Sequence, residues 1–167
     1  MFDCGLKILI YFFPFVSIAS NIDQVFLLVT INNPPTLTTF IDRFLVTAEA
    51  YSIKAVLVFN KIDTYDIEER AEILYLKDIY EPIGYECIEV SSTKGTNVDQ
   101  IKELMKGKVS MFSGHSGVGK TTLVNAIEPG LNLKTKEISE QHKQGQHTTT
   151  FAEMFELSFG AKIIDTP

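Results

Sequence analysis

The sequence predicts an α/β domain with a mostly parallel, six-stranded sheet and helices on both of its faces. Short apolar runs that suit buried strands alternate with stretches of helical periodicity. A glycine-rich loop at 114–121 follows one apolar run, and a polar motif at 60–63 follows another. Ligands of parallel α/β sheets gather beyond the carboxyl ends of the strands, so both loops are expected at one edge of the sheet.

The composition indicates one globular domain. The chain has 167 residues, of which 45% are hydrophobic and 22% charged, which suits a sizeable core and argues against a disordered chain. The net charge of −6 predicts no generally basic surface, so any contact with RNA would be local. Two cysteines, Cys4 and Cys87, and three scattered histidines show no disulfide or zinc spacing, which favours a reducing, cytoplasmic location.

Residues 1–18 form an atypical apolar segment ahead of the domain, which we expect to occupy 19–167. Lys7, the apolar run 8–16 and the small residues after it leave a signal peptide open as one interpretation. Asp3 lies where a signal peptide should be basic, however, and the run is too short to cross a bilayer. We therefore favour an atypical or damaged N-terminus and expect no membrane contact.

The first elements of the domain are a strand, a helix and a second strand. A β-branched apolar run predicts a buried strand at 24–31, which two prolines end. A helix is predicted at 39–51, because Thr39-Phe40-Ile41-Asp42 resembles a capping box. Its expected core stripe consists of Phe40, Ile41, Phe44, Leu45 and Ala48. A second buried strand is predicted at 55–59.

The second strand leads into Asn60-Lys61-Ile62-Asp63. A carboxylate here accepts hydrogen bonds from the ring N1–H and the exocyclic amine of guanine, whereas adenine has no hydrogen on N1 and no amine at that edge. Asp63 therefore predicts selection of guanine. Asn60 is expected to brace the neighbouring loops, and the stem of Lys61 to lie along the base. By itself the motif is weak, because a polar turn also ends many strands.

A helix, a strand and a shorter helix come next. The helix predicted at 66–81 begins with a capping aspartate, and its expected core stripe consists of Ile67, Ala71, Leu74 and Ile79. The strand predicted at 85–90 runs into Ser91-Ser92-Thr93-Lys94-Gly95. This loop is similar to the S-A-K loop whose backbone contacts the guanine carbonyl oxygen, which makes Ser91 and Ser92 candidate nucleotide contacts. The shorter helix ends at Gly107 and presents Val98, Ile101, Leu104 and Met105 on one face.

The strongest motif is Gly114-His115-Ser116-Gly117-Val118-Gly119-Lys120-Thr121, which fits the G-x-x-x-x-G-K-[ST] pattern of a phosphate-binding loop. An apolar run at 108–112 and a helical stretch at 121–127 supply the strand and helix that this loop needs. The glycines allow positive φ angles that bring backbone N–H groups to phosphate oxygens, and the helix directs its positive end to the same place. A glycine-rich turn without a ligand is the weaker alternative.

Side chains at the end of this loop have separate expected roles. Lys120 is a catalytic candidate because it brings a mobile positive charge to the β- and γ-phosphates. The hydroxyl of Thr121 is placed to bind Mg²⁺. Thr122, the next residue, is also expected to contact the nucleotide.

Three consecutive threonines follow a polar stretch that continues to Gln146. One of Thr148, Thr149 and Thr150 could bind Mg²⁺ and sense the γ-phosphate, as the threonines of switch loops do. The sequence does not choose firmly among them. Thr149 and Thr150 are taken as catalytic candidates, with Thr149 as the metal ligand. His147 stays open between a general base, an RNA contact and a loop residue.

Two strands close the chain, at 151–158 and 162–165, with a tight turn between them. The second leads into Asp165-Thr166-Pro167, where a D-x-x-G motif needs one glycine more. Asp165 completes the set of expected nucleotide contacts.

The motifs occur in an unusual order. In the Ras-like arrangement the phosphate loop precedes N-K-x-D and S-A-K, whereas here both of these motifs come before the phosphate loop. The sequence therefore predicts a circularly permuted Ras-like P-loop GTPase domain, which a compact fold tolerates when its original termini lie close together. The predicted spatial order of the strands is 151–158, 162–165, 109–113, 24–31, 55–59 and 85–90.

The permuted order and five segments together resemble the ribosome small-subunit-dependent GTPase A family, from about residue 20 to 167. These segments are 21–24, 41–45, 60–63, 114–123 and 147–150. The resemblance implies a cytoplasmic, monomeric enzyme that binds GTP and GDP, uses Mg²⁺ for hydrolysis, and has the small ribosomal subunit and its rRNA as partners. Members of the family also have an OB-fold and a zinc-binding domain. We expect neither within these residues, and expect zinc only in that further domain.

Two other functions stay open. A P-loop ATPase or kinase would bind ATP better than GTP. A truncated binding module would hold GTP with little or no hydrolysis, because the D-x-P-G amide that meets the γ-phosphate lies beyond Pro167. The same truncation predicts that one covering helix is missing and that an apolar strip of the sheet is exposed.

Overall fold

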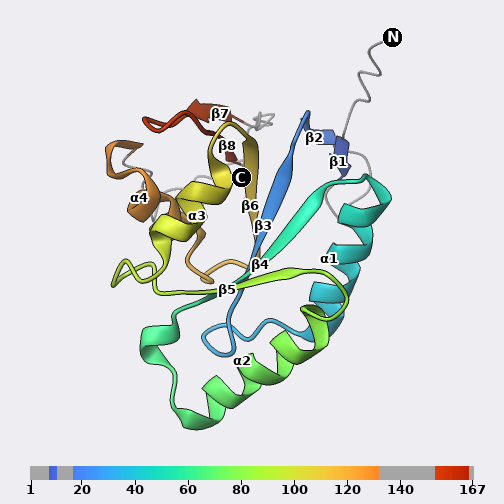
Figure 1. Ribbon diagram of the computed structural model, residues 1–167, viewed down its shortest axis with the longest axis vertical. Helices are drawn as coiled ribbons and strands as arrows, with labels where there is room; N and C mark the ends of the chain where they lie inside the picture. The colour runs from blue at the N-terminus through green and yellow to red at the C-terminus, as the bar shows by residue number, and fades with distance from the viewer. Residues whose placement is uncertain (1–7, 11–16, 132–152, 166–167) are drawn as a thin grey trace, which may run out of the picture.

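The computed structural model describes residues 8–10, 17–131 and 153–165, and its centre is a six-stranded sheet (Figure 1). The spatial order is β5-β4-β3-β6-β8-β7, and neighbours run parallel except for β7, which is antiparallel to β8. The strands are β3 (Gln24–Val29), β4 (Lys54–Asn60), β5 (Glu86–Val90), β6 (Val109–Ser113), β7 (Glu153–Glu156) and β8 (Lys162–Asp165). The predicted strand order and the mostly parallel sheet are confirmed.

The central strands are buried on both faces, as their continuous apolar runs predict. All of β3 is buried, and so is β4 after Lys54. Because successive side chains point to opposite faces, each strand contributes to two core clusters. Val25, Leu27 and Val29 lie in the first cluster, and Phe26 and Leu28 in the second.

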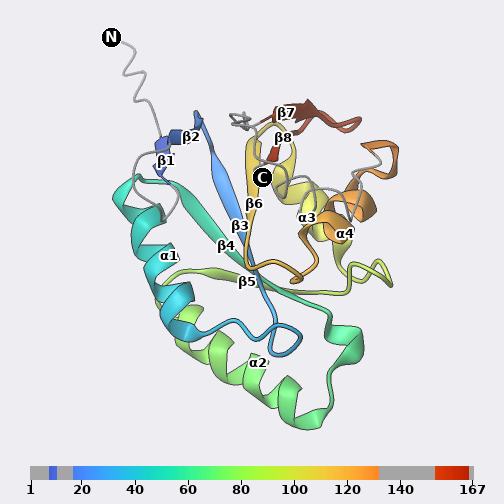
Figure 2. The same cartoon turned by 180° about the vertical axis from the view of Figure 1, so that it is seen from behind.

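Helices cover both faces of the sheet (Figure 1, Figure 2). The first cluster packs under α1 (Thr38–Ala50) and α2 (Ile67–Tyr80), and the second under α3 (Val98–Met105) and α4 (Lys120–Ile127). The apolar stripes predicted for the last two helices are confirmed. Their buried residues are Val98, Ile101 and Met105 in α3, and Leu123, Val124 and Ile127 in α4.

The start of α1 differs from the prediction. Its N-cap is Leu37, which makes no side-chain cap, so the capping box at Thr39 is wrong. The amides of Phe40 and Ile41 already donate to the Leu37 carbonyl at 2.9 and 3.2 Å, which places both threonines before them inside the first turn. The predicted stripe itself faces the core, where Ile41, Leu45 and Ala48 are buried and two phenylalanines pack against the same cluster.

The buried face of α2 also differs from the prediction. Asp66 and Glu69 form the predicted capping box. The four predicted core residues are all exposed, however: Ile67, Leu74 and Ile79 by 87%, 59% and 37%, and Ala71 as well. The buried residues are instead Ile73, Leu76 and Tyr80. Apolar residues occupy both faces of this helix, and the face that carries Tyr80 packs against the core. The Tyr80 hydroxyl donates to Asp42 Oδ1 at 2.8 Å.

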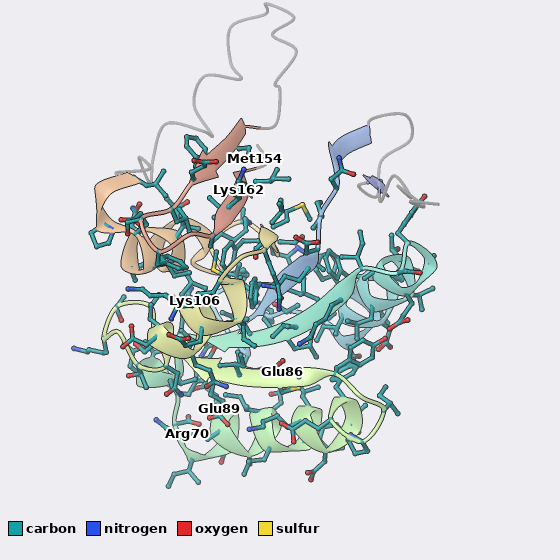
Figure 3. All side chains as sticks on the ribbon, turned by 45° about the horizontal axis from the view of Figure 1, so that its top comes forward. Arg70, Glu86, Glu89, Lys106, Met154 and Lys162 are labelled. Carbon is teal, nitrogen blue, oxygen red and sulfur yellow. The ribbon has the colours of Figure 1, made fainter. Side chains whose placement is uncertain are left out.

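The expected exposed strip at the edge of the sheet is small in the described residues. Met154 on β7, which pairs with Ile164 of β8, is 52% exposed (Figure 3). Met111 of β6 and Ile164 of β8 are buried in the first cluster, so these described residues form no exposed strip.

A short strand pair, β1 (Ile8–Ile10) and β2 (Ser17–Ser20), precedes the domain and is antiparallel. The sequence predicted no regular structure there. Within the described ranges, no helix has both the length and the apolar character needed to cross a membrane.

Candidate functional site

The two predicted motifs meet at one edge of the sheet. β4 ends at Asn60 and β6 ends at Ser113, and both run parallel to β3, which lies between them. Their following loops border a shared open cavity of about 120 Å³. Its lining consists of Asn60, Lys61, Asp63, Thr64, Ser92, Thr93, Gly119 and Thr122. Residues from the N-K-I-D motif and from the phosphate loop therefore face the same space.

The Asp63 carboxylate lies in a short 3-10 turn, η1 (Ile62–Thr64), and accepts two hydrogen bonds from the loop after β5. The Ser91 hydroxyl donates to Oδ1 at 2.6 Å, and the Thr93 hydroxyl donates to Oδ2 at 3.1 Å. The hydrogen bond from Ser91 is the main cause that holds the pKa of Asp63 below its usual value, which keeps the carboxylate ionised. An ionised carboxylate at the cavity wall can accept two N–H donors of a planar base.

Asn60 joins three loops through its side chain, which is buried. Its Nδ2 donates to the Val118 carbonyl of the phosphate loop at 2.8 Å. Its Oδ1 accepts from the Ser92 amide at 3.2 Å and from the Ser92 hydroxyl at 2.8 Å. We call the loops at 60–64 and 91–95 the base-recognition loops. The Asn60 side chain thus fixes the distance between them and the phosphate loop.

Lys61 makes a second connection to the phosphate loop. Its Nζ donates to the Gly117 carbonyl at 2.7 Å and to the Asn33 carbonyl at 2.5 Å. The amine therefore ties the loop after β3 to the phosphate loop, while the stem lies at the cavity wall. Ile62, by contrast, packs against the first core cluster and does not line the cavity.

The glycines of the phosphate loop are required by backbone conformation and by close contacts. Gly114, Gly117 and Gly119 have φ angles of 141°, 85° and 98°. A Cβ at Gly114 would lie 2.7 Å from the Leu28 carbonyl oxygen, and one at Gly119 would lie 2.4 Å from Asn60 Nδ2. The loop can therefore approach its neighbours only without side chains at these positions.

The remaining loop residues divide between anchoring and ligand-facing positions. Val118 is fully buried in the second cluster and anchors the loop. Lys120 begins α4, and its Nζ donates to the carbonyls of Gly114 and His115 at 2.6 and 3.0 Å. Thr121 lies in the first turn of the same helix, where a hydroxyl can join the backbone N–H groups around a phosphate and its metal.

Two residues contact the phosphate loop although no sequence motif marks them. The ring of Phe40 in α1 lies 4.1 Å from the ring of His115, centroid to centroid. Pro34 Cδ lies 3.3 Å from the position that a Cβ of Gly117 would occupy. Both residues come from the chain after β3. The sequence predicts Phe40 only as part of a core stripe and Pro34 only as the end of a strand, because their contacts with the phosphate loop depend on tertiary structure alone.

Several candidates lie at the margin of what the structure describes. Thr148, Thr149, Thr150 and His147 lie outside the described residues. Asp165 is the last residue of β8, whose neighbour β6 leads into the phosphate loop. No group of three or more potential metal-binding side chains of His, Cys, Asp or Glu occurs among the residues that the structure covers.

Comparison with known proteins gives consistent results. The chain is 73% identical over 150 residues to "Small ribosomal subunit biogenesis GTPase RsgA" of Christiangramia forsetii and 71% identical to the protein of that name from Flavobacterium johnsoniae. Each match covers 90% of this chain but 48% and 46% of the relative. The chain therefore spans about half the length of these relatives.

Solved structures show the same fold. YjeQ from Thermotoga maritima matches with a TM-score of 0.76 at 40% identity, covering 89% of this chain and 48% of that one. YloQ, described as a circularly permuted GTPase, matches with a TM-score of 0.67 at 30% identity, covering 89% of this chain and 45% of that one. The circularly permuted fold predicted from the motif order is therefore confirmed. A family model described as RsgA GTPase matches residues 15–167, and the chain belongs to that family.

Proposed function

We propose that the chain binds GTP and hydrolyses it with Mg²⁺, and that this reaction serves biogenesis of the small ribosomal subunit. The observation that supports this most directly is that Asp63 and Gly119 of the phosphate loop border the same cavity. The ribosomal part rests on the names of the relatives, each called a small ribosomal subunit biogenesis GTPase. The small subunit and its rRNA are then the partners of a cytoplasmic, monomeric protein.

Guanine selection follows from the charge and hydrogen bonding of Asp63. Its ionised carboxylate accepts hydrogen bonds from the N1–H and the exocyclic amine of guanine. Adenine offers no such pair of donors, so binding it would leave the carboxylate without partners from the base. Ser91 orients Oδ1 through its 2.6 Å hydrogen bond, and Asn60 holds the loop beside it.

Phosphate binding follows from the backbone of the loop and the start of α4. Three glycine φ angles above 80° allow the loop amides to turn toward the phosphates, and the helix adds its positive end. Lys120 brings a charge to the β- and γ-phosphates. Thr121 and one of the threonines at 148–150, for which we favour Thr149, would hold Mg²⁺, which neutralises negative charge on the transferred phosphoryl group.

An equilibrium titration of the purified chain with GTP, ATP and XTP, each with Mg²⁺, tests nucleotide choice. We expect GTP to bind at least 100-fold more tightly than ATP, because a site built to hydrogen-bond one base discriminates strongly against another. A preference for ATP would contradict guanine selection and would favour a P-loop ATPase or kinase.

Single-turnover hydrolysis of GTP, with and without purified small ribosomal subunits, tests the reaction and its partner. We expect hydrolysis that the subunits accelerate. Tight GTP binding with no turnover under either condition would contradict the proposed hydrolysis and would identify a module that only binds the nucleotide.

A further inference from the structure

Tyr65 lies between η1, the turn that carries Asp63, and α2. The residue is 7% exposed and belongs to the first core cluster. The hydroxyl donates to the Asn60 carbonyl at 2.7 Å and accepts from the Ile31 amide at 3.0 Å. One phenol therefore contacts the backbone at the ends of two neighbouring strands.

These contacts occur where the strand pairing stops. The parallel pairing of β3 with β4 ends at Val29 and Phe59. Beyond this pair β3 has ended and Asn60, the last residue of β4, pairs with Val90 of β5, and the Tyr65 hydroxyl bridges the Ile31 amide and the Asn60 carbonyl. It satisfies two backbone groups that would otherwise need other partners.

The chain after Asn60 lines the cavity, and the chain after Ile31 contacts the phosphate loop. The side chain of Asn60 contacts the Val118 carbonyl and Ser92, and the turn with Asp63 follows directly. The chain after Ile31 carries Pro34 to the phosphate loop. A shift of Asn60 would therefore move groups that line the cavity, and a shift of Ile31 would move the segment that packs on the phosphate loop.

We propose that Tyr65 is a positioning residue for nucleotide binding, whose hydroxyl holds the ends of β3 and β4 so that Asp63 and the phosphate loop face one guanine nucleotide. This inference rests on the proposed GTP binding. Burial raises the pKa of Tyr65, so the hydroxyl stays protonated and can donate throughout the neutral pH range.

Tyr80 provides a matched control. It is also a buried tyrosine, 2% exposed, and its hydroxyl donates one hydrogen bond, to Asp42 Oδ1 at 2.8 Å. It lies at the last residue of α2, whereas Tyr65 precedes that helix; neither tyrosine lines the cavity, but the Tyr65 hydroxyl donates to Asn60, which does. Removal of either hydroxyl deletes a side-chain donor without changing the apolar ring, but only Tyr65 contacts the site.

The experiment compares the parent chain with Tyr65→Phe and Tyr80→Phe. Dissociation constants are measured for GTP and ITP, which lacks the exocyclic amine, together with the melting temperature of each variant. For Tyr65→Phe we expect GTP affinity to fall about tenfold and the preference for GTP over ITP to shrink severalfold. Tyr80→Phe should change both binding quantities by less than about twofold, even if it lowers the melting temperature as much.

The outcomes separate the two claims. A parent chain that binds no guanine nucleotide would overturn the proposed function and this inference with it. A parent chain that binds GTP, with Tyr65→Phe matching Tyr80→Phe in affinity and base preference, would overturn the inference alone. If Tyr65→Phe does not fold, Tyr65→4-aminophenylalanine restores a donor to the Asn60 carbonyl. This variant should recover folding and GTP preference, and a folded chain without that preference would also overturn the inference.

Discussion

The base-recognition loops and the phosphate loop are held in place by different means. Side-chain hydrogen bonds hold the first, where Asn60 and Asp63 bond to the loop after β5 at distances from 2.6 to 3.2 Å. Backbone conformation shapes the second, where three glycines with positive φ lead into α4, and the side chains of Asn60 and Lys61 donate to two of its carbonyls. Side-chain changes in the first region should therefore alter selectivity or affinity by degrees. Added atoms in the second should remove binding of every nucleotide.

The largest effect is expected from Gly119→Ala. The new Cβ would lie 2.4 Å from Asn60 Nδ2 at a φ of 98°, so the loop or Asn60 must move. We expect the affinity for both GTP and GDP to fall at least 100-fold, measured by isothermal titration calorimetry.

Gly84→Ala is the matched control for that substitution. Its φ is 103°, but no atom lies within 4 Å of the added Cβ. Both substitutions carry a backbone strain of about 1–2 kcal/mol. Only the variant in the loop should lose nucleotide binding. Equal losses of nucleotide affinity in the two variants would show that backbone strain, and not crowding against Asn60, weakens nucleotide binding.

An intermediate effect is expected from Lys61→Met. This change keeps most of the apolar stem but removes the amine that donates to the Asn33 and Gly117 carbonyls. We expect GTP affinity to fall about tenfold, as for the loss of one or two hydrogen bonds. Lys54→Met removes an exposed ion pair with Glu86 and should change affinity by less than about twofold. Identical titration curves for the two variants would argue against the role of Lys61.

A smaller effect is expected from Ser92→Ala. The hydroxyl bond to Asn60 Oδ1 disappears, but the Ser92 amide still donates to the same oxygen at 3.2 Å. We expect a loss of stability of about 1 kcal/mol in urea unfolding and a change in GTP affinity below about threefold. A tenfold loss would mean that the hydroxyl itself, and not the amide, fixes Asn60.

The smallest effect concerns pH. The pKa of Asp63 is lowered, chiefly by the Ser91 hydrogen bond, so the carboxylate stays ionised when the pH falls below neutrality. A lowered folded-state pKa contributes stability that is present above the ordinary pKa of aspartate, about 3.9, and is lost as the pH falls through the folded value. The ratio of GTP to ITP affinity, in which phosphate titration cancels, should stay constant from pH 7 to 5. A decline centred near pH 6 would contradict an ionised Asp63.

Much of the fold could be predicted because buried parallel strands carry continuous apolar runs. The strand order followed from the order of the motifs, since each motif marks the carboxyl end of a known position in the sheet. The face of α2 could not be predicted in the same way. Ile67 and Leu74 have the same helical spacing as a core stripe, and only the tertiary structure shows that the face with Ile73, Leu76 and Tyr80 is the buried one.

The candidate site also contains residues that the sequence could predict and residues that it could not. Asp63 and the phosphate loop could be found because their chemistry requires particular residues at fixed spacing. The sequence did not mark Tyr65, and it predicted Phe40 as a core residue only, because an aromatic residue in such a place usually belongs to the core. Their roles depend on hydrogen bonds and ring contacts to loops distant in sequence, which no local pattern encodes.

The central claim is that one nucleotide contacts both regions at once. The most direct test measures the ratio of GTP to XTP affinity in the parent chain and in Asp63→Asn, because asparagine can donate to the second carbonyl of xanthine where aspartate repels it. We expect the parent to prefer GTP and the variant to prefer XTP, with the phosphate loop unchanged. A variant that still prefers GTP would contradict the claim.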